Sequence, residues 1–99
     1  MHDVVYAPEA EAQLLALYFH IASAASPDIA ANYTDAIMKQ CESLSAFPHR
    51  GARRDDIRPG VRVFGFRRRV SIVFEVTGGL VTVLGIFYGG QSFETTFDE

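Results

Sequence analysis

The stretch "VRVFGFRRRVSIVFEVTGGLVTVLGIF", residues 61–87, decides the fold. It contains three runs of β-branched and aromatic residues, at 61–66, 70–76 and 80–87, and these compositions are typical of strands. The "TGG" at 77–79 suits a tight hairpin turn, because glycine tolerates a positive φ at either central position. We therefore predict a three-stranded antiparallel meander.

Both faces of this meander are apolar. The face expected beneath the helices carries Val70, Ile72, Phe74, Val76, Leu80, Leu84 and Ile86. The face expected on the other side carries Val73, Val81, Val83 and Phe87. Because an antiparallel sheet with one solvated face alternates more cleanly, the second face predicts a cover. Two covers remain open: the C-terminal tail at 91–99, through Phe93 and Phe97, or a partner chain.

Upstream of the meander, the pattern predicts a short strand at 2–7 and two helices. Pro8 suits the first turn of a helix, and Ser26 can cap the second helix with Pro27 at its first position. The residues expected to be buried in the first helix are Ala10, Leu14, Leu17 and Ile21, with Leu15, Tyr18, Phe19 and Ala22 widening the stripe. Those of the second are Ala30, Tyr33, Ile37, Cys41, Leu44 and Phe47. The predicted fold is α+β: an N-terminal strand, an antiparallel helical hairpin, then the meander.

Positive charge is concentrated in one part of the chain. Residues 50–69 hold eight arginines and two aspartates, a net charge of +6, although the whole chain is at −3. Arg67, Arg68 and Arg69 lie at the first reversal of the meander. Arginine grips carboxylate or phosphate with two parallel hydrogen bonds, so the cluster predicts an anionic partner. Asp55 and Asp56 could satisfy two or three of these arginines internally.

Length and composition limit the classes of protein. The 99 residues are expected to form a single domain, and no apolar run reaches the roughly 20 residues of a membrane helix. The N-terminus has no signal-peptide pattern, and the lone Cys41 fits a reducing compartment, so we expect a soluble, cytoplasmic protein. Scattered histidines and the absence of a glycine-rich phosphate loop predict neither metal nor cofactor.

One reaction that needs no metal, the cleavage of RNA, can be tested against these residues. It needs an acid, a base and cations beside the phosphate. The arginines could supply the cations, but each acid–base candidate has a structural alternative. Glu75 could pair with an arginine of the neighbouring strand, Tyr88 could lie at the core margin, and His49 could lie in solvent.

The order of elements and several phrases resemble the ParE/RelE superfamily of toxins from bacterial type II toxin–antitoxin systems, and the ParE branch in particular. The resemblance covers residues 3–92 and is most specific in "FPHRGARRDDIRPGVR" (47–62) and "VTVLGIFYGG" (81–90). The matching residues are Leu44, Phe47, Pro48, Gly51, Arg53, Ile57, Arg58, Gly60, Arg62, Phe74, Leu84, Ile86, Tyr88 and Gly89.

The resemblance implies a toxin that is neutralised by a cognate antitoxin, which lays an extended segment over apolar and basic surface and can form a hetero-oligomer. ParE-type members poison DNA gyrase without being enzymes, and RelE-type members cut messenger RNA on the ribosome. The expected antitoxin or target contacts are Arg53, Arg54, Arg58, Arg62, Arg67, Arg68, Arg69, Val73, Val81, Val83 and Phe87. For the ribonuclease alternative, the nearest counterparts of the RelE residues are Arg62, Arg69 and Tyr88, and the RelE lysines are absent.

Overall fold

The computed structural model describes residues 1–89. The elements are β1 (Asp3–Tyr6), α1 (Pro8–Ala24), α2 (Pro27–Glu42), the 3-10 turn η1 (Ser43–Ser45), β2 (Ala52–Arg53), β3 (Val61–Phe66), β4 (Val70–Thr77) and β5 (Leu80–Tyr88). In this part of the chain, one sheet has the order β1-β5-β4-β3-β2. β1 runs parallel to β5 and the other neighbours are antiparallel, so the predicted α+β fold with its meander is confirmed. The two-residue β2 was not predicted.

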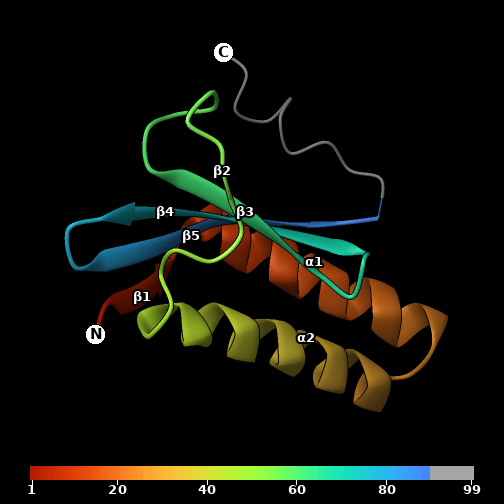
Figure 1. Cartoon of the computed structure of the whole chain (residues 1–99). Coiled ribbons are helices and arrows are strands. Elements are labelled where there is room, and N and C mark those ends of the chain that lie inside the picture. Colours follow the sequence, from red (N-terminus) through yellow and green to blue (C-terminus); the bar gives the residue numbers. More distant parts are fainter. Residues whose placement is uncertain (90–99) are drawn as a thin grey trace.

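The two helices form the predicted antiparallel hairpin and lie on the same side of the sheet (Figure 1). Pro8 opens α1, where the missing N–H of proline costs no hydrogen bond. Ser26 caps α2, because its Oγ accepts a hydrogen bond from the Ile29 N–H at 3.1 Å. Local signals that the sequence displays therefore set where both helices begin.

The main core lies between the helices and the sheet. Phe74 is fully buried at its centre and meets the ring of Phe64 edge to face, with the ring centroids 5.8 Å apart. The strands contribute Phe64, Phe66, Val70, Ile72, Phe74, Val81, Val83 and Ile86, and the helices and η1 contribute Ala10, Leu17, Ile37, Cys41 and Leu44. The prediction for β4 is confirmed, since its even-numbered apolar residues face the helices.

The face predicted for Val81 and Val83 is wrong. Both pack in the helix-side core, whereas Leu84 packs on the opposite face. The register explains the error, because Phe74 pairs with Val83 but Val73 pairs with Gly85, which leaves Leu84 as an additional residue. Such a bulge inverts the alternation of every residue on one side of it.

The second face of the sheet carries a smaller buried cluster. Val61, Val73 and Phe87 form it, and Ile57 from the loop between β2 and β3 packs against them with Val63 and Leu84. The loop rises on the side of the sheet away from the helices (Figure 1). Val73 and Phe87 are on the predicted face, but both are already buried. The predicted contacts of Phe93 and Phe97 lie outside the described residues.

Three aromatic and aliphatic side chains expected in the interior lie in solvent instead. Leu15 and Phe19 of α1 are 57% and 59% exposed, so α1 does not bury its widened stripe. Phe47 is 65% exposed, because α2 ends at Glu42 and the helical spacing no longer applies beyond η1. The sheet and α2 occupy the remaining sides of α1, and the side that carries Leu15 faces outward.

Candidate functional site

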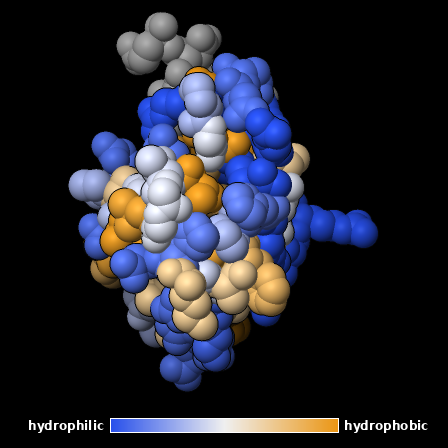
Figure 2. All heavy atoms as spheres, turned by 60° about the vertical axis from the view of Figure 1, so that its left-hand side comes forward, coloured by the Kyte–Doolittle hydropathy of each residue, from blue (hydrophilic) through white to orange (hydrophobic). Residues whose placement is uncertain are grey.

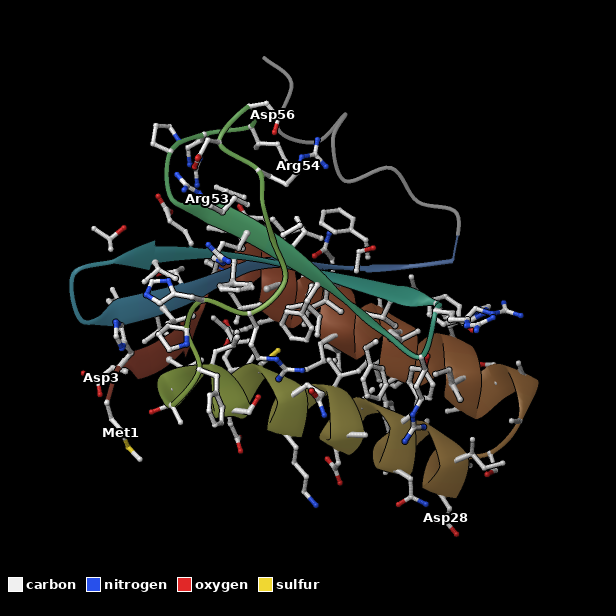
Figure 3. The ribbon with its side chains drawn as sticks, viewed as in Figure 1. Met1, Asp3, Asp28, Arg53, Arg54 and Asp56 are labelled. Atoms are coloured by element: carbon white, nitrogen blue, oxygen red, sulfur yellow. The ribbon has the colours of Figure 1, made fainter. Side chains whose placement is uncertain are left out.

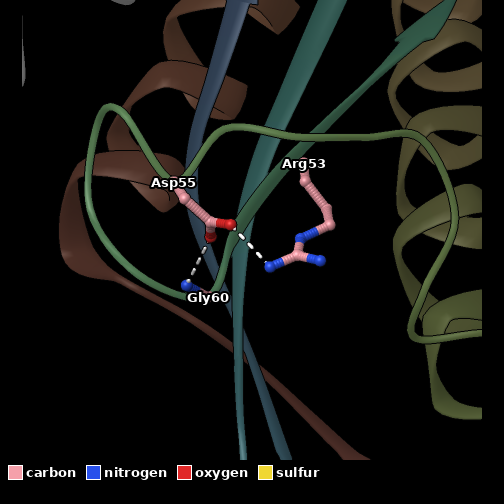
Figure 4. A network of polar contacts seen from close by, with 3 residues as sticks. All are labelled: Arg53, Asp55 and Gly60. Atoms are coloured by element: carbon pink, nitrogen blue, oxygen red, sulfur yellow. Dashed lines mark hydrogen bonds and ion pairs between the residues drawn. The ribbon is translucent and has the colours of Figure 1, made fainter.

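The loop between β2 and β3 pairs its own charges. Asp55 links both ends of the loop, because its Oδ2 accepts from Arg53 Nη2 at 2.7 Å and its Oδ1 from the Gly60 N–H at 3.2 Å (Figure 4). Arg54 binds both carboxylate oxygens of Asp56, at 3.0 and 2.9 Å. Figure 3 shows Arg53, Arg54 and Asp56 close together above the sheet. The upper part of the face seen in Figure 2 is largely hydrophilic.

The two aspartates hold their protons weakly. The Gly60 N–H and the Arg53 guanidinium lower the pKa of Asp55, and the hydrogen bonds from Arg54 lower that of Asp56. A lowered pKa means that the loop contacts are fully present above the ordinary aspartate range and are lost as the pH falls through the lowered values. At neutral pH these aspartates therefore neutralise two of the eight clustered arginines.

Arg58 and Arg50 also have partners within the fold. Arg58 Nη2 lies 3.3 Å from Glu75 Oε1, so Glu75 pairs with a loop arginine and not, as predicted, with one on the neighbouring strand. Arg50 Nη1 donates to Ser43 Oγ at 2.7 Å, and its guanidinium lies over the Phe64 ring at 4.7 Å. A partly exposed ion pair such as Arg58–Glu75 adds little stability, but these contacts fix the direction of both arginine side chains.

Arg62 has a structural position. Its Nε donates to the Arg50 carbonyl at 3.0 Å, and its Nη2 donates to the carbonyls of His49 and Gly51 at 2.6 and 3.3 Å. One guanidinium thus satisfies three successive backbone oxygens of the segment that leads into β2. These hydrogen bonds hold Nε and Nη2 of Arg62 against the backbone, so only Nη1 is left to serve the predicted contact role.

We predict that Arg62→Ala lowers the free energy of unfolding by about 2 kcal/mol, because three carbonyls lose a charged donor. Arg62→Lys should restore only part of this, since an ammonium cannot reproduce the planar fork. Chemical denaturation measures both, with Arg53→Ala as the exposed control that should change stability by less than about 0.5 kcal/mol. If Arg62→Ala kept full stability, the structural role would be wrong.

The turn between β3 and β4 differs from this loop. Arg67 and Arg68 have φ of 51° and 62°, and the Arg69 N–H donates to the Phe66 carbonyl at 3.2 Å. All three arginines are exposed. Within residues 1–89, none of their guanidinium groups has a carboxylate within ion-pair distance. We call Arg67, Arg68 and Arg69 the arginine turn.

An aromatic cluster lies behind the arginine turn. The Arg67 guanidinium lies 4.8 Å from the Phe66 ring centroid and 5.6 Å from that of Tyr33. Tyr33 contacts Tyr88 edge to face at 6.3 Å, and the His20 ring lies 5.9 Å from Tyr88. Burial raises the pKa of Tyr33, while the charges of Arg67 and Arg69 oppose that shift. Arg67 therefore rests on rings of β3 and α2, and Tyr88 and His20 pack next to Tyr33 behind them.

The three residues of the ribonuclease alternative are not brought together. Arg69 lies beside the end of β5, because the Gly89 N–H donates to its carbonyl at 2.7 Å and Tyr88 pairs with Val70. Arg62 pairs with Phe74, four positions further along β4. At about 3.3 Å per residue this separates Arg62 from Tyr88 by roughly 13 Å along the strands.

The structure has a groove between α1 and α2 that was not predicted from the sequence. Its volume is about 330 Å³, and its lining residues are Tyr6, Glu11, Leu14, Leu15, Tyr18, Thr34 and Met38. Leu15 stands at its rim, with Phe19 one turn further along the exposed side of α1. The helical spacing showed that Leu15 and Phe19 lie on one side of α1. Whether that side is covered depends on the tertiary fold, which the spacing does not reveal.

Cys41 does not offer a nucleophile. The thiol is fully buried in the main core, and burial raises its pKa to about 11, so it stays protonated at neutral pH. In the described part of the chain, no three His, Cys, Asp or Glu side chains gather as metal ligands would. Across residues 1–89, no helix is both long and apolar enough to span a bilayer.

The fold and these surfaces define a class of small α+β proteins, in which a helical hairpin covers one face of a mixed sheet and arginines line the strand connections. The family model described as "ParE toxin of type II toxin-antitoxin system, parDE" matches residues 4–93. The chain therefore belongs to the ParE toxin family of type II toxin–antitoxin systems, as the resemblance indicated.

A solved structure supports this membership. The chain is similar to one in the structure described as the chromosomal ParDE toxin–antitoxin system from P. aeruginosa, with a TM-score of 0.78 and 29% identity. The similarity covers 90% of this chain and 97% of that chain. Among curated proteins, no match is found.

Proposed function

We propose that this protein inhibits DNA gyrase in the cytoplasm and that direct binding of its cognate antitoxin prevents the inhibition. Membership of the ParE toxin family over residues 4–93 carries this proposal. The related P. aeruginosa structure is described as a ParDE toxin–antitoxin system, which supports an antitoxin as the partner of this chain. In this proposal the toxin acts by binding and performs no chemical reaction.

The ribonuclease alternative has less support from the geometry. Metal-free cleavage needs its acid, base and cations around one phosphate. Arg62 is held by three backbone carbonyls at a distance from Arg69 and Tyr88, so these residues do not converge on one point. The arrangement favours a binding toxin.

The antitoxin contact is best placed on the groove between α1 and α2. Leu15 and Phe19 are apolar and more than half exposed. A partner that covers them removes apolar surface from water, and this stabilises the complex. The surface predicted from the sequence is a poorer site. Val81 and Val83 face the helices. Val73 and Phe87 are already buried in the cluster against which Ile57 of the loop between β2 and β3 packs.

The first experiment is a supercoiling assay with purified protein, gyrase and antitoxin. We expect the toxin to stop supercoiling and the antitoxin to restore it. Supercoiling that proceeds normally at excess toxin would contradict the gyrase proposal. Cuts in messenger RNA near ribosomal A sites after induction would favour the alternative instead.

A matched pair of variants tests the antitoxin contact. Leu15→Glu places a charge at the rim of the groove, whereas Ile29→Glu alters a side chain of similar exposure, 53%, that does not line it. We expect Leu15→Glu to inhibit gyrase but to need at least about tenfold more antitoxin for rescue, because burying a charge in an apolar contact is costly. Ile29→Glu should be rescued like the unmodified toxin. Equal rescue of both would place the contact elsewhere.

A further inference from the structure

We infer that the arginine turn, Arg67 to Arg69, is the element with which this protein contacts the phosphates of duplex DNA. The inference rests on the proposed function, because gyrase acts on DNA and a toxin bound to it lies close to the duplex. It adds a second ligand and names the residues that bind it. Four features of the turn support it.

The first feature is the contrast between two groups of arginines. In the loop between β2 and β3, Arg53 and Arg54 bind aspartates of the same loop, and Arg58 binds Glu75. In the arginine turn, no described carboxylate lies within ion-pair distance of any guanidinium. Within residues 1–89, neighbouring carboxylates therefore balance the positive charge of the loop but not that of the turn.

The second feature is the backbone. Positive φ at both central residues of a hairpin turn is the geometry that Asn-Gly and Gly-Gly adopt without strain. Here arginine occupies both positions, at 51° and 62°, although side chains with a Cβ disfavour this region. The other hairpin of the meander has glycine at Gly78, with φ of 58°. Strain that is retained at an exposed position points to a function for the side chains themselves.

The third feature is the platform behind Arg67. Its guanidinium lies over the rings of Phe66 and Tyr33, which orient the group and leave the N–H donors at its edge available. The Phe66 ring is buried, and Tyr33 is part of the aromatic cluster at the end of the sheet. One cation of the turn is therefore preorganised, which lowers the entropy lost on binding an anion.

The fourth feature decides between phosphate and carboxylate. Three adjacent arginines match an anion that presents several closely spaced charges better than they match a single carboxylate. Duplex DNA carries one charge per about 1.7 Å of helix axis whatever its sequence. The guanidinium fork fits a phosphate with two parallel hydrogen bonds. A sequence-independent contact with the DNA backbone is thus the ligand that matches the turn.

The experiment measures the binding of the full-length protein to a fluorescent duplex of about 20 base pairs over a range of salt concentrations. Three phosphate contacts predict a slope of log affinity against log salt of about −2.7, a loss of about 40-fold between roughly 50 and 200 mM. Arg68→Gly removes one charge and relieves one positive φ. It should reduce the slope to about −1.8 with a melting temperature no lower than that of the unmodified protein.

Arg53→Ala is the matched control, because it also removes one exposed arginine, but one that is paired with Asp55. Its slope should stay at about −2.7. Equal slopes for Arg68→Gly and the unmodified protein would overturn the inference, as would no binding at low salt or tighter binding to RNA than to duplex DNA.

The supercoiling assay separates this result from that of the proposed function. If the duplex is bound through the turn but gyrase is unaffected, the gyrase proposal fails and the inference holds. If gyrase is inhibited by a protein that does not bind DNA, the inference fails and the gyrase proposal holds.

Discussion

Gly51→Ala is expected to lower the free energy of unfolding by about 3 kcal/mol or more. Gly51 has a φ of 74°, and a Cβ there would overlap the Val63 carbonyl of the paired strand and lie close to Phe64 Cβ. A left-handed φ costs alanine about 1–2 kcal/mol, and backbone that cannot move aside adds to this. The reason is that the backbone just before β2 lies directly against Val63 and Phe64 of β3, which leaves no room for a side chain.

Gly78→Ala is the matched control. Gly78 also has a positive φ, 58°, but no atom lies within 4 Å of a Cβ built on it. Its cost should be about 1 kcal/mol, from the backbone alone. Denaturant unfolding of both variants gives the difference. If the two substitutions lowered the stability equally, the close approach of Gly51 to β3 would be contradicted.

Phe74→Ala is expected to have the largest effect of all, about 3–5 kcal/mol. Phe74 is fully buried, and its loss leaves a cavity beside the ring of Phe64 in the centre of the main core. Since a domain of this size has a total stability of about 5–15 kcal/mol, this variant should unfold at markedly lower denaturant concentration.

Phe19→Ala removes the same side chain from the exposed side of α1, where it is 59% exposed. It should change the stability of the isolated protein by less than about 1 kcal/mol. A loss comparable to that of Phe74→Ala would show that α1 buries this side, as the sequence pattern suggested, and would remove the exposed surface proposed for the antitoxin.

Elements with local signals could be predicted from the sequence. The meander, the Gly78 turn and the Ser26 cap depend on residues close together in the chain, and their predicted positions are confirmed. The faces of β5 could not be predicted, because a single additional residue, Leu84, inverts the alternation. Gln13 of α1 satisfies the Ile86 N–H next to this bulge at 2.7 Å, a contact 73 residues apart that no local pattern reveals.

The site was harder to predict for a similar reason. The arginine cluster was visible in the sequence, but which of its members pair with a carboxylate of residues 1–89 depends on where Asp55, Asp56 and Glu75 come to lie. Arg62 looks like its neighbours in the sequence, yet its donors are aimed at three backbone carbonyls. The exposure of Leu15 and Phe19 could not be predicted either, because it depends on which sides of α1 the sheet and α2 cover.

Growth after induction, with and without the cognate antitoxin, tests the central claim most directly. A member of the ParE toxin family that acts as proposed should arrest growth when expressed alone, and simultaneous expression of its antitoxin should restore growth. Unimpaired growth of cells that demonstrably contain the folded protein, without any antitoxin, would contradict this account.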